Sequence, residues 1–266
     1  MLEFGKALDV GIKRRGKKNQ DAIKIVNPPF KPPMLIVADG MGGFRGGSEA
    51  SQIVIKTLAK AYRKGKRQQS LADTLTNAIL KAHQNIIKRS KKSDALAKMG
   101  STVAVAILDE KDQKLTVANV GDSRIYLVRP TGIEMISYDH SEVAELKRGG
   151  VLSDKEAQDY ARKNVLTMSL MASRPAETIK PFIAEKPFPP DAVVLLCSDG
   201  LWGCVSEHII RLTALEYPPM KAAARLVEFA NTSGGPDNIS VLIARRKGAW
   251  KNYIKEHAVN IQETIN

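Results

Sequence analysis

Residues 34–43 read MLIVADGMGG, an apolar run that ends in an aspartate and a glycine-rich turn. A short apolar run bounded by turn-forming residues is typical of a buried strand, so Met34–Ala38 is predicted to deliver Asp39 at its end. A second stretch repeats the pattern, because the apolar run Ala192–Cys197 is followed closely by Asp199. The sequence therefore predicts two buried strands that each place a carboxylate at one end.

Two pairs of helical patterns surround these strands. Apolar residues recur at helical spacing over residues 47–61 and again over 71–86, which predicts two antiparallel helices that each bury one face. Two further helical stretches, at about 207–215 and 219–230, precede a last predicted strand, Ile239–Ala244.

The segment between the helix pairs has the texture of a β-meander, with apolar runs separated by turn formers. The predicted strands are Thr102–Leu108, Leu115–Asn119, Arg124–Val128 and Ile133–Ile136. Strands and helix pairs thus alternate in blocks, whereas a doubly wound parallel sheet would alternate single strands with single helices. The pattern favours an α+β fold in which antiparallel sheets carry helix pairs outside.

The chain of 266 residues is expected to form one domain over residues 1–246. Residues 141–190 show weak helical patterns near Glu142–Arg148 and Asp154–Arg162, followed by a predicted proline-punctuated coil over 174–190. This segment is expected to be mobile or variable. Residues 247–266 form a polar tail, predicted to be either helical or disordered.

Composition limits the function classes. No stretch approaches the roughly 20 apolar residues that a spanning helix needs, and the two cysteines, Cys197 and Cys204, are too few for a disulfide framework, so we expect a cytoplasmic protein. The formal charge of +13 favours anionic partners, which could be nucleic acid, an acidic membrane surface or phosphorylated protein. One basic group, residues 13–18, directly precedes the segment Asn19-Gln20-Asp21.

Three aspartates followed by glycine or asparagine are candidate metal ligands: Asp39, Asp199 and Asp237. Carboxylates at strand ends can converge on one point, where hard cations such as Mg²⁺ or Mn²⁺ neutralise them. Each pair taken alone also fits an ordinary turn, so the prediction of a metal site depends on all three pairs together and on the motifs around them.

Seven blocks occur in a defined order along the chain. They are Asn19-Gln20-Asp21, Ala38-Asp39-Gly40-Met41-Gly42-Gly43, Gly100-Ser101-Thr102, Asn119-Val120-Gly121-Asp122-Ser123-Arg124, Asp139-His140-Ser141, Ser198-Asp199-Gly200-Leu201-Trp202 and Asp237-Asn238-Ile239-Ser240. With them the chain closely resembles the bacterial form of the type-2C, metal-dependent serine/threonine protein phosphatases, from about Gly11 to about Arg245.

The resemblance implies an α/β/β/α sandwich in which two central antiparallel sheets are flanked by pairs of antiparallel helices, with residues 141–190 as the flap. It implies two Mn²⁺ or Mg²⁺ ions in the active site. Asp39 would bridge both ions, the Gly40 carbonyl would bind one, and Asp199 and Asp237 would hold the other. Asp21 would position metal-bound water.

The implied reaction is in-line attack on phosphorus by a metal-bridging hydroxide, without a covalent enzyme intermediate. In similar bacterial enzymes the aspartate at the position of Asp122 joins the one at Asp199 in holding a third, weaker metal. A turn role for Asp122 is an equal alternative from the sequence alone.

The chain departs from the family pattern at three positions. Gln20 stands where many relatives have a glutamate that contacts metal-bound water, and Met41 stands where eukaryotic relatives have a histidine. The usual phosphate-holding arginine is replaced by Gly16, so the sequence favours Arg15 as its substitute, then Arg14, with Lys17 as a third candidate, because a guanidinium binds phosphate through two parallel hydrogen bonds.

The leading hypothesis is a monomeric protein serine/threonine phosphatase of signal transduction, which acts on phosphorylated substrates of a serine/threonine kinase and does not bind membranes. Gly16 and Gln20 motivate an alternative, a non-catalytic phosphoprotein-binding member of the same family. A second alternative, nucleic-acid binding, rests on the positive charge alone and predicts strongly salt-dependent binding. The seven blocks favour the phosphatase.

Overall fold

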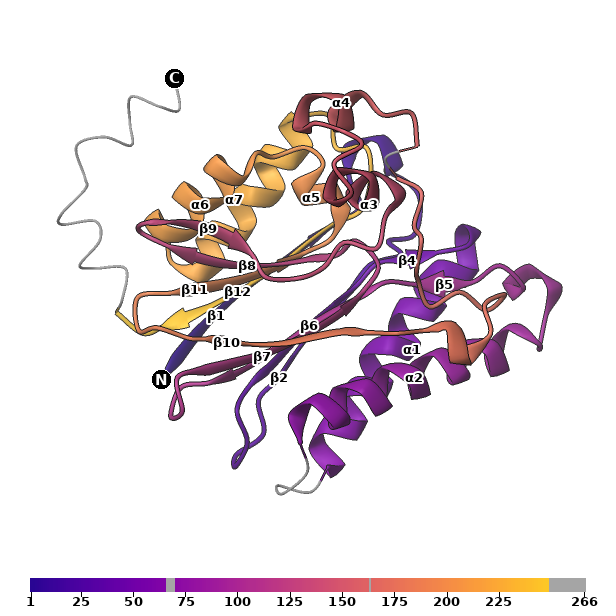
Figure 1. Ribbon diagram of the computed structural model, residues 1–266, viewed down its shortest axis with the longest axis horizontal. Coiled ribbons are helices and arrows are strands. Elements are labelled where there is room, and N and C mark those ends of the chain that lie inside the picture. Colours follow the sequence, from indigo (N-terminus) through magenta and orange to yellow (C-terminus); the bar gives the residue numbers. More distant parts are fainter. Residues whose placement is uncertain (66–69, 163, 249–266) are drawn as a thin grey trace.

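The fold is a four-layer sandwich, seen here in a computed structural model that describes residues 1–65, 70–162 and 164–248 (Figure 1). Within these residues two five-stranded antiparallel sheets lie face to face, with helices on both outer sides. The predicted α/β/β/α sandwich is therefore confirmed. None of the described helices is long and apolar enough to cross a membrane.

The first sheet has the strand order β1-β12-β11-β8-β9. Its strands are β1 (Leu2–Asp9), β12 (Ile239–Arg246), β11 (Val193–Cys197), β8 (Arg124–Arg129) and β9 (Gly132–Met135). Outside it pack α6 (Glu207–Glu216) and α7 (Pro219–Thr232). The short helix α5 (Asp199–Trp202) follows β11 directly.

The second sheet has the order β10-β7-β6-β3-β2. Its strands are β10 (Phe182–Pro187), β7 (Lys114–Val120), β6 (Val103–Asp109), β3 (Met34–Ala38) and β2 (Ala22–Val26). The long helices α1 (Gly43–Lys64) and α2 (Leu71–Ser90) cover its outer face. The small pair β4 (Gly40–Met41) and β5 (Gly100–Ser101) lies at the end of this layer.

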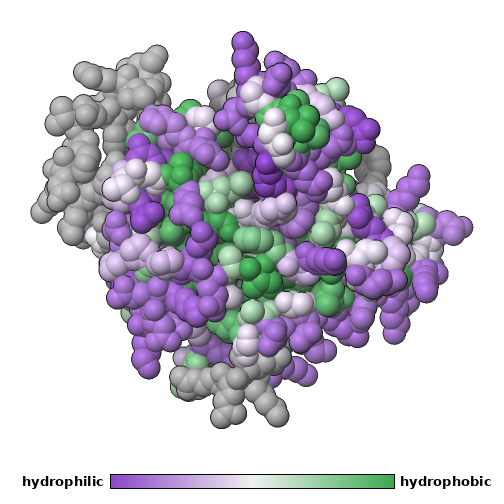
Figure 2. All heavy atoms as spheres, viewed as in Figure 1, coloured by the Kyte–Doolittle hydropathy of each residue, from purple (hydrophilic) through white to green (hydrophobic). Residues whose placement is uncertain are grey.

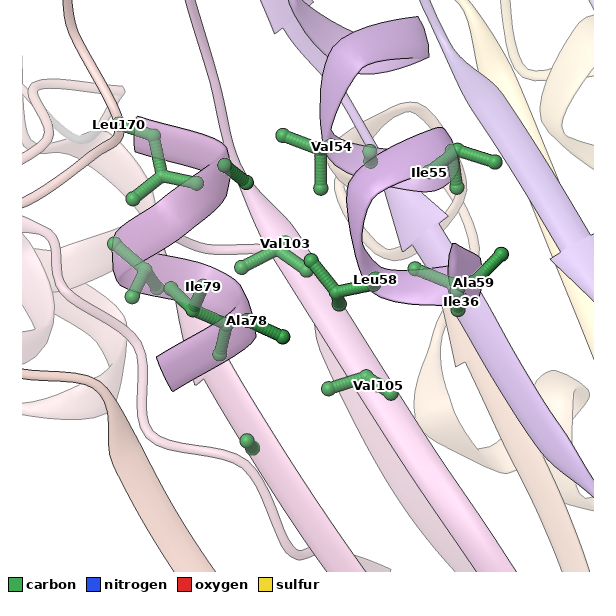
Figure 3. Packing of buried hydrophobic residues seen from close by; sticks show 14 of the residues in the cluster. Ile36, Val54, Ile55, Leu58, Ala59, Ala78, Ile79, Val103, Val105 and Leu170 are labelled. Atoms are coloured by element: carbon green, nitrogen blue, oxygen red, sulfur yellow. The ribbon is translucent and has the colours of Figure 1, made fainter. Parts of the chain in front are cut away.

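Apolar side chains fill all three gaps between the layers. Leu58 of α1 and Ile79 of α2 pack against Ile36 of β3 and Val105 of β6, all fully buried (Figure 3). A second cluster joins the other sheet to α6 and α7, and a third lies between the sheets. On the face seen in Figure 2, polar side chains predominate and apolar ones gather near the middle, over the central sheets.

The segment over residues 141–190 differs in part from the sequence expectation. Helices α3 (Glu142–Arg148) and α4 (Asp154–Asp159) form close to where weak helical patterns were predicted, each with a serine N-cap. The prediction of coil over residues 174–190 is wrong for β10, which pairs with β7 along its whole length. Four prolines in or near this strand hid it, and Pro187 is tolerated because β10 is an edge strand. The polar tail beyond residue 248 lies outside the described residues.

Candidate functional site

Strand ends bring acidic residues from distant parts of the chain to one end of the sandwich. Asp39 follows β3, and Asp21 precedes β2, whose first residue Ala22 pairs with Ala38. On the other sheet Asp199 follows β11 and Asp237 precedes β12. These two strands pair with each other, with Cys197 opposite Val241. Asp122 lies in the turn between β7 and β8. The structure thus gathers the acidic residues that the sequence singled out.

Asp39 lies at the centre of this group. Its side chain is partly buried, and this burial raises its pKa well above the ordinary range. The negative charges of Asp21, Asp199, Asp122 and Asp237, in that order, raise the pKa further. The acidic side chains therefore lie close enough for each to feel the charge of the others.

Two serine hydroxyls fix the orientation of Asp21. Ser198 Oγ donates to Asp21 Oδ2 over 2.7 Å, and Ser240 Oγ donates to the same oxygen over 2.6 Å. Burial raises the pKa of Asp21 to about 7 against the lowering effect of these hydroxyls. The other oxygen, Oδ1, is buried and has no hydrogen-bond partner among the described residues.

Asp199 and Asp39 share a hydrogen bond between their side chains. Burial and then the charge of Asp237 raise the pKa of Asp199 to about 6, while the hydrogen bond to Asp39 and the positive charge of Arg14 lower it. Asp199 Oδ1 is buried without a hydrogen-bond partner in the part of the chain described. Two carboxyls in such contact hold a proton or a cation between them.

Asp237 pairs with a residue from the loop that joins the two sheets. Arg14, at the end of a short 3₁₀ turn (Ile12–Arg14), places Nη2 2.7 Å from Asp237 Oδ2. Both side chains are about one-third exposed, at 33% each. Arg15, the first choice from the sequence, is exposed on this loop, and Gly16 has a φ of 81° with open space around it. The structure therefore brings Arg14 to the carboxylates.

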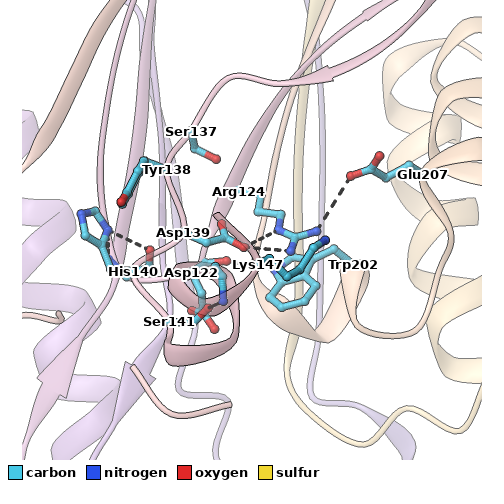
Figure 4. Close-up of polar contacts among 12 residues, drawn as sticks. Asp122, Arg124, Ser137, Tyr138, Asp139, His140, Ser141, Lys147, Trp202 and Glu207 are labelled. Atoms are coloured by element: carbon cyan, nitrogen blue, oxygen red, sulfur yellow. Dashed lines mark hydrogen bonds and ion pairs between the residues drawn. The ribbon is translucent and has the colours of Figure 1, made fainter. Parts of the chain in front are cut away.

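A second group of side chains surrounds Asp122 (Figure 4). Trp202 Nε1 donates to the Asp122 carbonyl over 3.0 Å, and the Arg124 guanidinium stacks on the Trp202 ring with a centroid distance of 3.7 Å. Arg124 also pairs with Asp139 at 2.8 Å. Burial and the charges of Asp199 and Asp139 raise the pKa of Asp122 well above its usual range. This packing ties the Asp122 turn to α5 and to the segment before α3.

Two glycines let the chain segments approach at the site. A Cβ on Gly200 would lie 2.0 Å from the Asn238 carbonyl oxygen, and one on Gly40 would lie 2.1 Å from the Gly47 carbonyl oxygen. Only glycine permits such contacts. The Asp-Gly pairs at 39 and 199 are therefore not simple turns, because each glycine allows a second strand or helix to pack beside the aspartate.

Other residues of the motif blocks hold the segments that carry the aspartates together. The Gln20 backbone N–H donates to Asn238 Oδ1 over 2.8 Å, which ties the Asp21 segment to the Asp237 segment. Asp39 N–H donates to Thr102 Oγ1 over 3.0 Å, and Thr102 N–H donates to the Asp39 carbonyl over 2.8 Å. Met41 lies in β4 and is partly exposed.

The donor set suits hard divalent cations, which prefer carboxylate and carbonyl oxygens. Mutual repulsion and two unpartnered buried oxygens, on Asp21 and Asp199, are what a cation would relieve. As the side chains stand in the described residues, no three His, Cys, Asp or Glu groups form a ready-made ligand set. In this arrangement Asp237 is paired with Arg14.

The raised pKa of Asp21 predicts how the stability of the metal-free protein depends on pH. The carboxyl titrates at about 7 when folded and near 3.8 when unfolded, so the folded state binds the extra proton between these values. The charged form therefore costs stability above pH about 7, and this cost disappears as the pH falls toward about 4.

Thermal melts in excess chelator can measure this effect. The melting temperature of the wild type, minus that of Asp21→Asn, is expected to increase as the pH is lowered from about 7 to about 5. A difference that stays constant or decreases over this range would contradict the raised pKa. The Asn variant keeps the shape of the side chain and removes its charge, so the pH dependence of the difference reports on Asp21 together with its coupling to the neighbouring carboxyl groups.

Comparisons with known proteins return relatives that span nearly the whole chain. The family model described as Protein phosphatase 2C matches residues 11–238. The serine/threonine phosphatase stp of Listeria innocua is 32% identical over 232 residues, covering 86% of this chain and 90% of that relative.

Solved structures agree with these matches. The serine/threonine phosphatase PstP/Ppp of Mycobacterium tuberculosis superposes with a TM-score of 0.81 at 28% identity, covering 92% of this chain and 98% of the other. The catalytic domain of PstP in complex with two manganese ions superposes with a TM-score of 0.78 at 28% identity, covering 92% and 97%.

Proposed function

Since this chain belongs to the protein phosphatase 2C family, as its motifs predicted, we propose that it hydrolyses phosphoserine and phosphothreonine in proteins by in-line attack of hydroxide, without a covalent enzyme intermediate. The observation that carries the proposal is the convergence of buried and partly buried carboxylates from strand ends around Asp39. When bound, two divalent cations would supply the hydroxide at neutral pH and offset the charge that develops on the phosphate.

Asp39, the Gly40 carbonyl, Asp199 and Asp237 would hold these cations. The manganese-bound PstP structure supports Mn²⁺, and Mg²⁺ suits the same oxygen donors. Asp21 is held by two hydroxyls beside the group, so it can orient a water molecule on a cation. The Gln20 side chain can do the same through its amide, with less electrostatic attraction than a glutamate.

Asp122 would contribute to a further cation position together with Asp199. The charge of Asp199 raises the pKa of Asp122, second only to burial, which supports a position of the two carboxylates near each other. The contact of Trp202 with the Asp122 carbonyl keeps this turn beside α5, which begins with Asp199.

Arg14 is the proposed phosphate-holding residue. Its guanidinium already reaches the carboxylate group, so a phosphate bound there can replace Asp237 as its partner once cations neutralise the aspartate. Cations on Asp237 would weaken its pairing with Arg14 and so favour a shift of the guanidinium toward the substrate phosphate.

Substitution at Arg14 and Arg15 separates the two candidates. Arg14→Ala is expected to lower kcat/KM for a phosphopeptide by about 100-fold, roughly 3 kcal/mol, because a charged group that contacts the phosphate is lost. Arg15→Ala serves as the matched control and should change kcat/KM by less than about threefold. Equal losses in both variants, or a larger loss in Arg15→Ala, would reject the assignment.

The substrates are proposed to be phosphorylated proteins, made by a serine/threonine kinase. A direct test is phosphate release from phosphoserine, phosphothreonine and phosphotyrosine peptides with added Mn²⁺. We expect the first two to be hydrolysed and the third to be a much poorer substrate. Binding of these peptides without any turnover would instead support the non-catalytic alternative raised by Gly16 and Gln20.

A further inference from the structure

A groove runs along the open side of the sandwich, between the edge strands of the two sheets. Its volume is about 550 Å³. Within the described residues β1 and β2 each have a strand neighbour on one side only. The backbone N–H and C=O groups on the other side of each strand therefore face the groove. Apolar lining residues are Phe4, Leu8, Ile23, Ile25, Met220 and Leu242. Two of them remain exposed to solvent, Leu8 at 45% and Met220 at 54%.

One end of this β1–β2 groove lies next to the carboxylate group. Leu8 pairs with Ser240, whose hydroxyl binds Asp21. Ser240 is three residues from Asp237 along the chain, a distance of about 10 Å at about 3.3 Å per residue. On the other wall Ile23 is two residues from Asp21. The groove therefore begins within a few residues' length of the place where phosphate would bind.

The groove and its approach carry positive charge. Lys6 and Lys24 belong to its lining, one on each strand. The loop between β1 and β2, which contains Arg14, also exposes Lys13, Arg15 and Lys18. The nearest acidic residues of β1 are directed elsewhere: Glu3 lies 3.9 Å from Arg245, and Asp9 accepts a hydrogen bond from the Gly11 N–H at 2.8 Å.

We propose that the β1–β2 groove binds the extended acidic segment that flanks the phosphorylated residue of a protein substrate. This inference rests on the proposed function and adds a substrate class to it. Apolar side chains of such a segment would fill the groove, its carboxylates would meet Lys6 and Lys24, and its backbone could pair with an edge strand. A five-residue extended segment spans about 17 Å, which matches the length of β1 from Phe4 to Leu8.

Steady-state kinetics on two phosphothreonine peptides of equal length can test this. One carries a six-residue extension of alternating Glu and Val, the other an extension of Gly and Ser. For the wild type, KM for the Glu/Val peptide should be about tenfold lower, and Lys6→Glu combined with Lys24→Glu should remove this advantage. Met220→Glu should also raise KM for the Glu/Val peptide while leaving kcat unchanged.

The matched control combines Lys81→Glu with Lys180→Glu, two exposed lysines that do not line the groove, and should retain the wild-type preference. A small aryl phosphate reports on the catalytic site alone, and its turnover should be the same in all variants. The inference is overturned if wild type shows no preference for the Glu/Val peptide, or if Lys6→Glu with Lys24→Glu keeps it. Failure of the proposed function would appear differently, as no aryl phosphate turnover in the wild type.

Discussion

Replacement of Asp39 by asparagine is expected to lower kcat by at least about a thousandfold, roughly 4 kcal/mol of transition-state stabilisation. Asparagine keeps the shape of the side chain and removes the charge that would hold two cations. The same substitution should raise the melting temperature of the metal-free protein, because burial and four neighbouring carboxylates disfavour a charge at this position. A loss of activity together with a higher melting temperature of the metal-free protein indicates that the residue serves to bind cations.

The two effects are measured by phosphopeptide kinetics with Mn²⁺ and by thermal melts in chelator. Asp191→Asn, at an exposed position before β11, is the matched control and should change neither quantity appreciably. Asp39→Asn with kcat within about threefold of wild type would contradict the assigned role. A fall in metal-free melting temperature would contradict the electrostatic account of the site.

Removal of divalent cations is expected to abolish turnover of phosphopeptide and aryl phosphate alike, by at least about a thousandfold, with recovery on addition of Mn²⁺. The carboxyl groups have no comparable way to activate water by themselves, since Asp39 and Asp199 hydrogen-bond each other and Asp21 is held by serines. Saturating Mn²⁺ should also raise the melting temperature, because a cation binds the folded state and not the unfolded chain.

Chelator that is first saturated with Mn²⁺ serves as the control for non-specific effects of the chelator. Activity that persists in excess metal-free chelator would exclude the proposed chemistry. A melting temperature that does not respond to Mn²⁺, in a protein whose turnover does respond, would place the cation on the substrate and not on the carboxylates.

The fold could be predicted from the sequence where local pattern and burial agree. Met34–Ala38 and Val193–Cys197 are buried throughout, and such short apolar runs between turn formers indicate buried strands. The edge strands were harder to recognise. β1 was not predicted, because lysine and glycine interrupt its apolar residues Leu2, Phe4 and Leu8. β10 was hidden by prolines. An edge strand faces solvent on one side, so its apolar signal is weak.

The candidate site was predictable at the level of its acidic residues and less so in its details. The seven motif blocks gave Asp21, Asp39, Asp122, Asp199 and Asp237, which the structure brings together. The choice between Arg14 and Arg15 depends on the path of the loop between β1 and β2, which the sequence does not define. Arg14 reaches Asp237 across 223 positions of the chain.

Roles of the surrounding polar residues were also missed. Ser198 and Ser240 stand inside the motif blocks, yet only the fold shows that both hydroxyls bind Asp21. The stacking of Arg124 on Trp202 joins residues from two separate blocks. These four residues could have been singled out because they lie in the motif blocks. The sequence does not show, however, in which direction their side chains point.

The most direct test of the central claim is a crystal structure of the protein grown with Mn²⁺, in which anomalous scattering locates each manganese ion. The account predicts two strong peaks between Asp39, the Gly40 carbonyl, Asp199 and Asp237, with Arg14 displaced from Asp237. Manganese peaks located only elsewhere on the molecule, with Asp39 and Asp199 still hydrogen-bonded to each other, would contradict it.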